Sequence, residues 1–388
     1  MLKTLLLQEP SIAKDKLAFV YAGDIYVADL QGQHVKRMTS HAASEYSPHL
    51  SPDGKWLAFT AGYEGNQDVY IISSEGGQPR RLTWHPGIDA VKSWSPDGKQ
   101  VLFTSFRDIA HNRTGQLFEV STEGGMPNKI MQAVVFDGEL SSDGVKLAYN
   151  PERLAHGGKN GWRNHRGGTT PPIWIYDLTQ NNYLEIPHGN FTDSSPMWVG
   201  DDVYFISDRD KHKNIYRYIN EQVEQVTHFT DWDIANADAD GTTIVFEKGG
   251  ALYTLNTLSG ATKVLSITIQ SDLPQRRIQW KDAMTALTSS QMSTSGKRVL
   301  LSARGDIYSV PVKDGSTYNL TNNAAAHERD GLWSPKGEQL AYITDREGRY
   351  KLELADQYGK VTKTINLGKN TADFFLFEWL KDIRIYTL

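Results

Sequence analysis

The 388-residue sequence contains no cysteine. Disulfide bonds, thiolate zinc sites, iron–sulfur clusters and cysteine nucleophiles are therefore excluded. The sequence also lacks an apolar run of the roughly 18–20 residues that a membrane-spanning helix requires. Blocks of Lys and Arg are absent, and the formal net charge is −5. This charge disfavours binding to nucleic acid or to an anionic membrane, because both need a basic protein surface.

Several motifs of catalytic and phosphate-binding sites are also missing. The sequence has no Gly-x-Ser-x-Gly elbow and no Gly-Lys pair followed by Ser or Thr. His327-Glu328 lacks the second histidine of a zinc peptidase helix. We find no convergent acidic residues of the kind expected in a propeller lactonase or glycosidase. The sequence therefore predicts no cofactor, no metal site and no catalytic motif, while a triad assembled across repeats stays open.

A turn motif recurs along the chain. Ser51-Pro52-Asp53-Gly54-Lys55 returns as Ser95-Pro96-Asp97-Gly98-Lys99, and the copies lie about 40–46 residues apart, the period of a β-propeller blade. Degraded copies are Ser141-Ser142-Asp143-Gly144, Asp238-Ala239-Asp240-Gly241, Ser293-Thr294-Ser295-Gly296 and Ser334-Pro335-Lys336-Gly337. Proline presets φ in a turn, aspartate bonds back to the backbone, and glycine tolerates a positive φ. The Ser and Asp residues of these motifs are thus predicted to form turns and not to catalyse a reaction.

Apolar strands follow each turn in a regular order. Trp56-Leu57-Ala58-Phe59 exemplifies the first strand, Asp68-Val69-Tyr70-Ile71 the second, and the third ends on a pair such as Leu82-Thr83. Alternating β-branched and aromatic residues suit strands whose two faces pack against neighbouring sheets. Four tryptophans at equivalent places beside the turns are predicted to pack between blades: Trp94, Trp198, Trp232 and Trp333. The corners Arg209-Asp210 and Arg346-Glu347 are predicted to form exposed ion pairs at the rim.

The repeats define an all-β organisation. They begin near Pro10, Ser51, Ser95, Ser141, Gly200, Asp238, Ser293 and Ser334. We predict a six-bladed β-propeller over residues 1–266, a linker over 267–291, and the first two blades of a second, incomplete propeller over 292–388. Two blades alone would leave an uncovered apolar face, so the natural protein is expected to continue past Leu388. The alternative is a single eight-bladed propeller.

The fourth repeat carries a basic insertion, Pro151 to Pro172, between its first and second strands. In an acidic protein such a loop can concentrate anionic groups, for example a peptide carboxylate. Candidate ligand-binding residues are Arg153, Lys159, Trp162, Arg163, His165 and Arg166. Contact with a ligand or channel, contact between subunits, and purely local ion pairing all remain open for this loop. His156 and His165 have no further metal-binding side chain nearby in the sequence.

Three stretches resemble the propellers of tricorn-type serine peptidases, within the broader group of TolB-like propellers. They are Trp162–Thr169 with Ile173-Trp174-Ile175, Ser207–Asp210 with Thr227–Asp233, and Ala303–Tyr308 with Leu320-Thr321, His327–Arg329 and Trp333-Ser334-Pro335. The order and spacing of these stretches match that family along nearly the whole chain.

The resemblance implies the amino-terminal propeller portion of a self-assembling oligopeptidase. It implies that the propellers act as sieve, channel and scaffold for oligopeptides, that the catalytic Ser and His lie in downstream domains, and that a homo-oligomer forms. Basic residues of the family's first propeller can anchor a peptide carboxylate, but the loop over 84–92 lacks adjacent arginines, so that anchor is not carried over. The alternative is a stand-alone TolB-like propeller that binds a protein partner. Leu5–Leu7 is too short for a signal peptide, so we expect a cytoplasmic protein, or a periplasmic one whose signal was removed.

Overall fold

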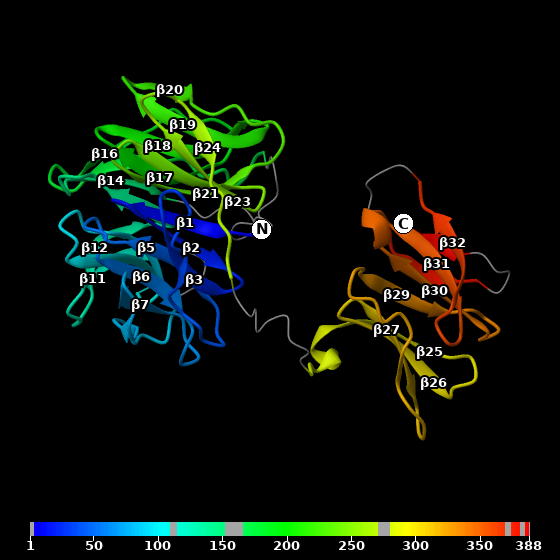
Figure 1. The fold of residues 1–388 in the computed structure, drawn as a ribbon. Coiled ribbons are helices and arrows are strands. Elements are labelled where there is room, and N and C mark those ends of the chain that lie inside the picture. The colour runs from blue at the N-terminus through cyan, green and yellow to red at the C-terminus, as the bar shows by residue number, and fades with distance from the viewer. Residues whose placement is uncertain are drawn as a thin grey trace. The chain divides into compact units, whose positions relative to one another are not determined.

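The computed structural model describes residues 4–108, 115–151, 166–270, 280–368, 374–380 and 385–387. The chain divides into two compact units, Met1–Gln275 and Arg276–Leu388. Antiparallel sheets of consecutive strands dominate both units, which confirms the predicted all-β class (Figure 1). No helix in the described part of the chain is long and apolar enough to cross a membrane.

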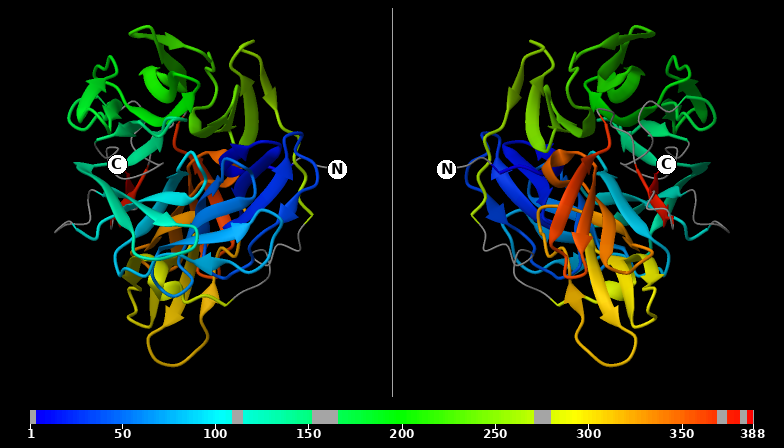
Figure 2. Two further views of the ribbon diagram at one scale, coloured as in Figure 1. Left: turned by 90° about the vertical axis from the view of Figure 1, so that its left-hand side faces the viewer. Right: turned by 90° about the vertical axis from the view of Figure 1, so that its right-hand side faces the viewer.

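Within the described ranges, the first unit contains six four-stranded sheets, which follow one another in chain order (Figures 1 and 2). The first three sheets comprise β1 (Gln8–Ala13), β2 (Lys16–Tyr21), β3 (Asp24–Asp29) and β4 (Lys36–Arg37); β5 (Glu45–Leu50), β6 (Trp56–Ala61), β7 (Asp68–Ser73) and β8 (Arg80–Arg81); and β9 (Asp89–Trp94), β10 (Gln100–Ser105), β11 (Gln116–Ser121) and β12 (Asn128–Val134). The next three comprise β13 (Asp137–Leu140), β14 (Lys146–Asn150), β15 (Trp174–Asp177) and β16 (Asn182–Glu185); β17 (Asp193–Val199), β18 (Asp202–Asp210), β19 (His212–Ile219) and β20 (Gln222–Gln225); and β21 (Ile234–Asp240), β22 (Thr243–Lys248), β23 (Ala251–Asn256) and β24 (Thr262–Val264).

The second unit begins with a short 3₁₀ helix, η2 (Ala283–Ala286). Its described strands form two four-stranded sheets and one two-stranded sheet. They are β25 (Leu287–Met292), β26 (Arg298–Ala303), β27 (Asp306–Pro311) and β28 (Tyr318–Asn319); β29 (Glu328–Trp333), β30 (Gln339–Thr344), β31 (Lys351–Asp356) and β32 (Val361–Asn366), with η3 (Arg346–Gly348) between β30 and β31; and β33 (Leu376–Trp379) with β34 (Ile385–Thr387).

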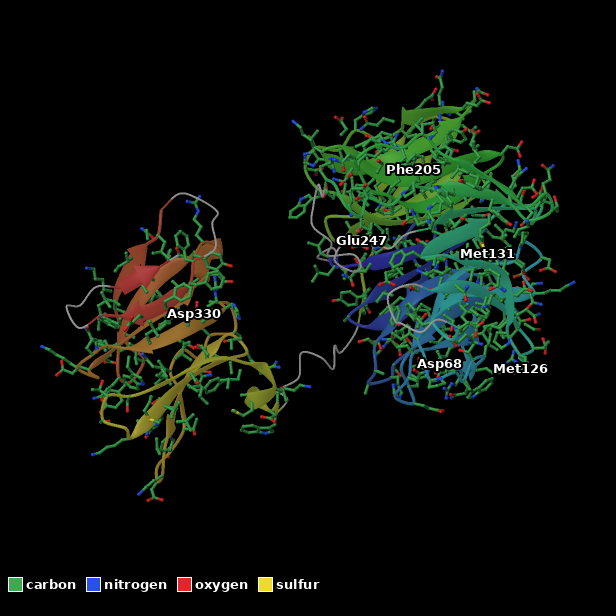
Figure 3. All side chains as sticks on the ribbon, turned by 180° about the vertical axis from the view of Figure 1, so that it is seen from behind. Asp68, Met126, Met131, Phe205, Glu247 and Asp330 are labelled. Carbon is green, nitrogen blue, oxygen red and sulfur yellow. The ribbon has the colours of Figure 1, made fainter. Side chains whose placement is uncertain are left out.

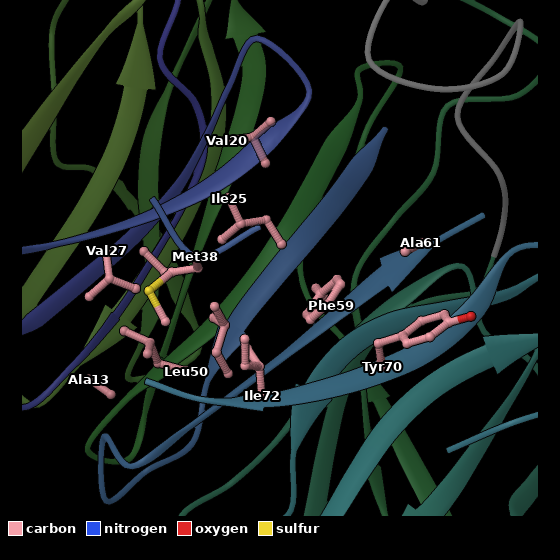
Figure 4. Packing of buried hydrophobic residues seen from close by; sticks show 12 residues of the cluster. Ala13, Val20, Ile25, Val27, Met38, Leu50, Phe59, Ala61, Tyr70 and Ile72 are labelled. Atoms are coloured by element: carbon pink, nitrogen blue, oxygen red, sulfur yellow. The ribbon is translucent and has the colours of Figure 1, made fainter. Parts of the chain in front are cut away.

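The strand period of two places one set of side chains on each face of a sheet. In the second sheet, Phe59 and Tyr70 pack toward the first sheet, together with Val20 and Ile25 (Figure 4). Ala58 faces the other way and joins the core shared with the third sheet. Both faces of such a strand are buried, which explains the nearly continuous apolar runs after each turn.

Every pair of consecutive sheets in the first unit encloses its own apolar core, and so do the first and the sixth sheets. The core between the sixth and first sheets contains Phe19 and Val245 and also the fully buried Leu7. Leu7 N donates to Gly250 O at 3.1 Å, and Thr4 N donates to Ile267 O at 3.0 Å. The residues before β1 therefore run along the sixth sheet. In the part of the chain that the structure describes, no strand belongs to both of these sheets.

The recurring Ser-Pro-Asp-Gly motif forms a turn, as predicted. Ser51 Oγ donates to Asp53 Oδ1 at 2.6 Å and accepts from Trp56 N at 3.0 Å, while Asp53 Oδ1 accepts from Lys55 N at 3.1 Å. Gly54 has φ of 71°, a left-handed conformation that favours glycine. These bonds lower the pKa of Asp53, so its carboxylate is committed to the turn.

The turn joins the first and second strands of a sheet and does not begin the sheet. The prediction that blades start at Ser51 and Ser95 is therefore displaced by one strand, since β5 starts at Glu45 and β9 at Asp89. Residues 89–92, assigned to a loop from the sequence, belong to β9. The first strands β5 and β9 were thus not predicted, whereas the predicted starts at Pro10 and Asp238 lie within the first strands β1 and β21.

Two smaller predictions also need correction. Arg209 does not pair with Asp210 but with the buried Asp193, Nη2 to Oδ2 at 2.9 Å. Arg346 likewise reaches the buried Glu328, Nη2 to Oε1 at 3.4 Å, because strand pairing brings these partners beside it. Trp232 is 66% exposed, because it lies in the loop before β21 and not on a strand.

The other three tryptophans lie in apolar cores, as predicted. Trp94, Trp198 and Trp333 each pack among side chains of two neighbouring sheets. At the outer edge, by contrast, Met126 is 89% exposed in the hairpin between β11 and β12 (Figure 3). The buried apolar side chains therefore lie between neighbouring sheets.

Candidate functional site

A cavity of about 540 Å³ lies along the innermost strands of the first unit. All six sheets contribute to its wall, through β1, β5, β9, β13, β17 and β21. The lining extends from Ser47 and Asp137, near the beginning of their strands, to Pro52 and Gly241 in the turns beyond the other strand ends. The cavity therefore follows the length of the inner strands.

Strand register defines one set of equivalent residues on these strands. The second strand of each sheet contains three consecutive apolar residues, such as Leu57-Ala58-Phe59. In each sheet, one residue of the inner strand pairs with the middle residue of these three. His49 pairs with Ala58 in this way, and Glu139 pairs with Ala148. The equivalent residues, in sheet order, are Ser11, His49, Ser93, Glu139, Met197 and Asp238. All of these except Ser11 line the cavity. They consequently form one level of its wall.

Asp238 was predicted to belong to a degraded turn motif, and the structure corrects this. Asp240 pairs directly with Thr243, so the turn between β21 and β22 is shorter than the turn at Ser51. This shorter turn moves Asp238 onto the level of His49 and Glu139. Its carboxylate Oδ2 accepts a hydrogen bond from Ile12 N of the first sheet at 2.9 Å.

Neighbouring sheets fix the backbone at this level. Trp94 Nε1 donates to His49 O at 2.8 Å, and Trp198 Nε1 donates to Glu139 O at 3.0 Å. Trp198 N also donates to Glu139 Oε2 at 3.3 Å. At the beginning of β1, Glu247 Oε2 accepts from Glu9 N at 3.1 Å and from Asn236 Nδ2 at 2.6 Å. The cavity wall is thus held by bonds between sheets.

Acidic groups predominate in the wall. The carboxylates are Glu9, Asp137, Glu139, Asp238 and Asp240, and the lysines are Lys92 and Lys213. Lys92 Nζ lies 3.7 Å from Asp137 Oδ1, so one positive charge is already balanced. The expectation that no acidic residues converge was therefore wrong. In the described ranges no group of three His, Asp or Glu side chains is arranged to hold a metal ion.

The surroundings favour the neutral forms of the titratable groups at this level. Burial raises the pKa of Glu139 well above its usual value, and repulsion from Asp238 and Asp137 adds to the increase. Burial also raises the pKa of Asp238, while the His49 imidazole opposes this change. Burial lowers the pKa of His49 despite the attraction of Asp238 and Asp137.

Five of the six residues proposed from the basic insertion lie outside the described residues: Arg153, Lys159, Trp162, Arg163 and His165. Arg166 is among the described residues, and its guanidinium group contacts Asp208. Its Nη1 lies 3.1 Å from Asp208 Oδ2, and its Nη2 donates to Asp208 O at 2.9 Å. Arg166 thus joins the insertion to the end of β18. The cavity residues His49, Glu139 and Asp238 were not singled out, although His49 and Glu139 each precede the serine of a turn motif by two residues.

Four-stranded antiparallel sheets of consecutive strands, set around a common cavity, define a β-propeller. Residues 4–261 match the family described as the tricorn protease N-terminal beta propeller domain. The chain belongs to this family.

The chain is also similar in sequence to two tricorn protease homologs and in fold to the tricorn protease. A tricorn protease homolog of Saccharolobus solfataricus is 24% identical over 335 residues, which are 85% of this chain and 31% of that protein. Putative tricorn protease homolog 2 of Streptomyces coelicolor is 26% identical over 367 residues, or 90% of this chain and 30% of that protein. The crystal structure of the tricorn protease superposes with a TM-score of 0.70 at 20% identity, covering 96% of this chain and 36% of that chain. The chain therefore spans about a third of the length of these relatives, and the structural likeness establishes the fold alone.

Proposed function

We propose that this chain is the amino-terminal propeller portion of a tricorn-like oligopeptide-degrading serine peptidase. In this role it is a sieve or channel for peptides and a scaffold for assembly, and the catalytic residues lie in other domains. The observation that carries the proposal is the cavity along the inner strands of all six sheets, in a chain of this family. A cavity that follows the strands from end to end suits an extended peptide better than a compact ligand.

The same proposal includes the arrangement of blades. Six sheets with six shared cores support a closed six-bladed propeller in the first unit, over residues 1–266. Two sheets and a following hairpin support the beginning of a second propeller after the linker at 267–291. Exposed apolar side chains at the start of the second unit suit packing against further sheets: Trp280, Met284, Leu287 and Met292.

The basic insertion enters the proposal as a second peptide contact. Arg163→Ala is expected to weaken peptide binding with little change in melting temperature. Arg166→Ala is expected to act differently, because Arg166 already bonds to Asp208 and its loss removes a contact within the fold. If instead Arg163→Ala changes only the oligomeric state, the insertion serves assembly.

Peptide binding without hydrolysis is the test of the proposed function. A capped peptide of about six to ten residues is titrated into the whole chain by calorimetry, and mass spectrometry follows its integrity. Binding without cleavage is expected. Ser142→Trp, at the cavity mouth, should reduce binding several-fold, whereas Glu123→Trp, in an exposed hairpin outside the cavity, should not. Cleavage by this chain alone, or binding indifferent to Ser142→Trp, would contradict the proposal.

A further inference from the structure

We propose that the central cavity selects peptides with a cationic side chain, and that Glu139 and Asp238 hold its ammonium or guanidinium group. This inference rests on the proposed function, since it names the chemistry that the peptide channel recognises. It starts from the register of the inner strands. Glu139 of the fourth sheet and Asp238 of the sixth sheet lie at the same level of the cavity wall.

The wall between these two carboxylates is apolar at that level. Met197 of the fifth sheet is the equivalent residue there; it lines the cavity and also packs, 2% exposed, in the core between the fifth and sixth sheets. Lysine and arginine side chains combine an aliphatic stem with a charged end. An apolar position flanked by two carboxylates therefore suits such a side chain better than it suits a short polar one.

Both carboxylates are held in place before a ligand arrives. Asp238 Oδ2 accepts from Ile12 N at 2.9 Å, and Glu139 Oε2 accepts from Trp198 N at 3.3 Å. Each acid is thereby oriented by the backbone of an adjacent sheet or strand. Preorganised acceptors lose little side-chain entropy when a cation binds between them.

Asn150 supplies an independent observation. It is 1% exposed and lines the same cavity. Its Nδ2 donates to Pro172 O at 2.7 Å and to Asp193 O at 3.0 Å, which fixes the orientation of the amide. Within the described residues, its buried Oδ1 accepts no hydrogen bond. Asn150 lies opposite Asp137, two residues from Glu139 along β13. A buried acceptor with no partner among the described residues suits a ligand that brings N–H donors, as ammonium and guanidinium groups do.

The charge balance points the same way. Five carboxylates and two lysines line the cavity, and Lys92 is close to Asp137. Even with Glu139 and Asp238 protonated, the three other carboxylates outnumber the two lysines, so an anionic group such as a peptide carboxylate would meet like charge. A bound cation would favour ionisation of both Glu139 and Asp238, because its charge offsets the repulsion between them.

Cation binding is linked to protonation of the cavity. Burial and neighbouring acids raise the pKa of Glu139, so a bound cation must displace a proton from it wherever the pH lies below that raised pKa. Affinity for the cationic peptide should therefore increase as the pH rises, with release of protons. The other charged and titratable groups of the cavity lining are Glu9, His49, Lys92, Asp137, Lys213, Asp238 and Asp240, of which Asp137 lies on the same strand as Glu139.

The test compares two capped peptides with the whole chain by isothermal titration calorimetry at pH 7.5. Acetyl-Ala-Ala-Lys-Ala-Ala-amide has one cationic group, and the same peptide with norleucine in place of lysine has none. We expect the lysine peptide to bind at least tenfold more tightly. Glu139→Gln retains an acceptor for Trp198 N and should reduce this preference at least fivefold. Glu123→Gln, in an exposed hairpin outside the cavity, is the matched control and should leave it unchanged.

Asp238→Asn is the second variant, and it should likewise reduce the preference for the lysine peptide. Asparagine keeps an oxygen that can accept from Ile12 N. The melting temperature of each variant shows whether it is folded. Equal affinity for both peptides, unaffected by Glu139→Gln in a folded protein, would overturn the inference and leave peptide binding itself intact. Failure of both peptides to bind would instead refute the proposed channel function along with it. Proton release, measured in buffers of different ionisation enthalpy, should fall in Glu139→Gln.

Discussion

Replacing Glu45 with glutamine is expected to stabilise the protein above pH 7 and to have little effect near pH 4.5. Glu45 begins β5 and is 1% exposed. In the third sheet the equivalent Asp89 pairs with Arg107 at 2.7 Å. The second sheet has Tyr63 at the position of that arginine, so Glu45 is buried without the guanidinium that its counterpart has.

The magnitude follows from the pKa of this carboxyl. Burial raises the pKa of Glu45 from 4.5 to about 7, and hydrogen bonds from Tyr63 and Thr39 offset only part of the effect. The folded protein therefore binds this proton more tightly than the unfolded chain. The protonated Glu45 side chain contributes its full share of the free energy of unfolding below pH 4.5. This contribution decreases as the pH rises to about 7, and above that pH it is lost. The difference between the two pKa values corresponds to about 3 kcal/mol.

Urea unfolding, followed by tryptophan fluorescence at pH 4.5 and pH 8, measures this effect. Glu45→Gln should gain up to about 3 kcal/mol over the parent protein at pH 8 and close to nothing at pH 4.5. Glu123→Gln removes an exposed carboxylate and should change stability by less than about 0.5 kcal/mol at either pH. An equal effect of Glu45→Gln at both pH values would refute the argument, because it would show that the charge of Glu45 is not the cause.

Two further predictions concern buried contacts and use the same unfolding assay. Arg209→Met should cost about 3 kcal/mol, since it removes the guanidinium from the buried Asp193, while Arg217→Met, which breaks an exposed pair, should cost at most about 1 kcal/mol. Comparable losses would mean that burial of the first pair is unimportant. Leu7→Ala should cost about 2–5 kcal/mol, because Leu7 is fully buried between the first and sixth sheets, and Leu6→Ala, at a 72% exposed neighbour, should be nearly neutral. A neutral Leu7→Ala would show that residues before β1 do not stabilise this junction.

The sequence predicted those parts of the fold that depend on local chemistry. The bonds of Ser51 and Asp53 lie within one turn, so the same residues are needed wherever the turn recurs, and the repeat becomes visible. The alternation of Phe59 with Ala58 is likewise a local consequence of strand geometry. The all-β fold class, the length of the repeat and the residues that form the turns could therefore be predicted from the sequence.

The cavity could not be read in this way, because its equivalent positions hold different residues. Serine, histidine, glutamate, methionine and aspartate all occur at one level of the wall, since the scaffold requires only a strand there and not a particular side chain. Ion pairs between neighbouring strands could not be predicted from the sequence either. Arg209 reaches Asp193, which is distant in sequence but adjacent in the sheet, and ignores its neighbour Asp210.

The junction between the first and sixth sheets has a consequence for the cavity. Among the described residues no strand belongs to both sheets, so this junction is held by side-chain packing and by individual hydrogen bonds. Asp238 bonds to Ile12 N across it and also lines the cavity. A group that weakens this bond when it binds Asp238 would favour separation of the two sheets, and separation would raise the affinity for that group by the same factor. Ligand binding in the cavity and contact between the first and sixth sheets would then be linked through Asp238.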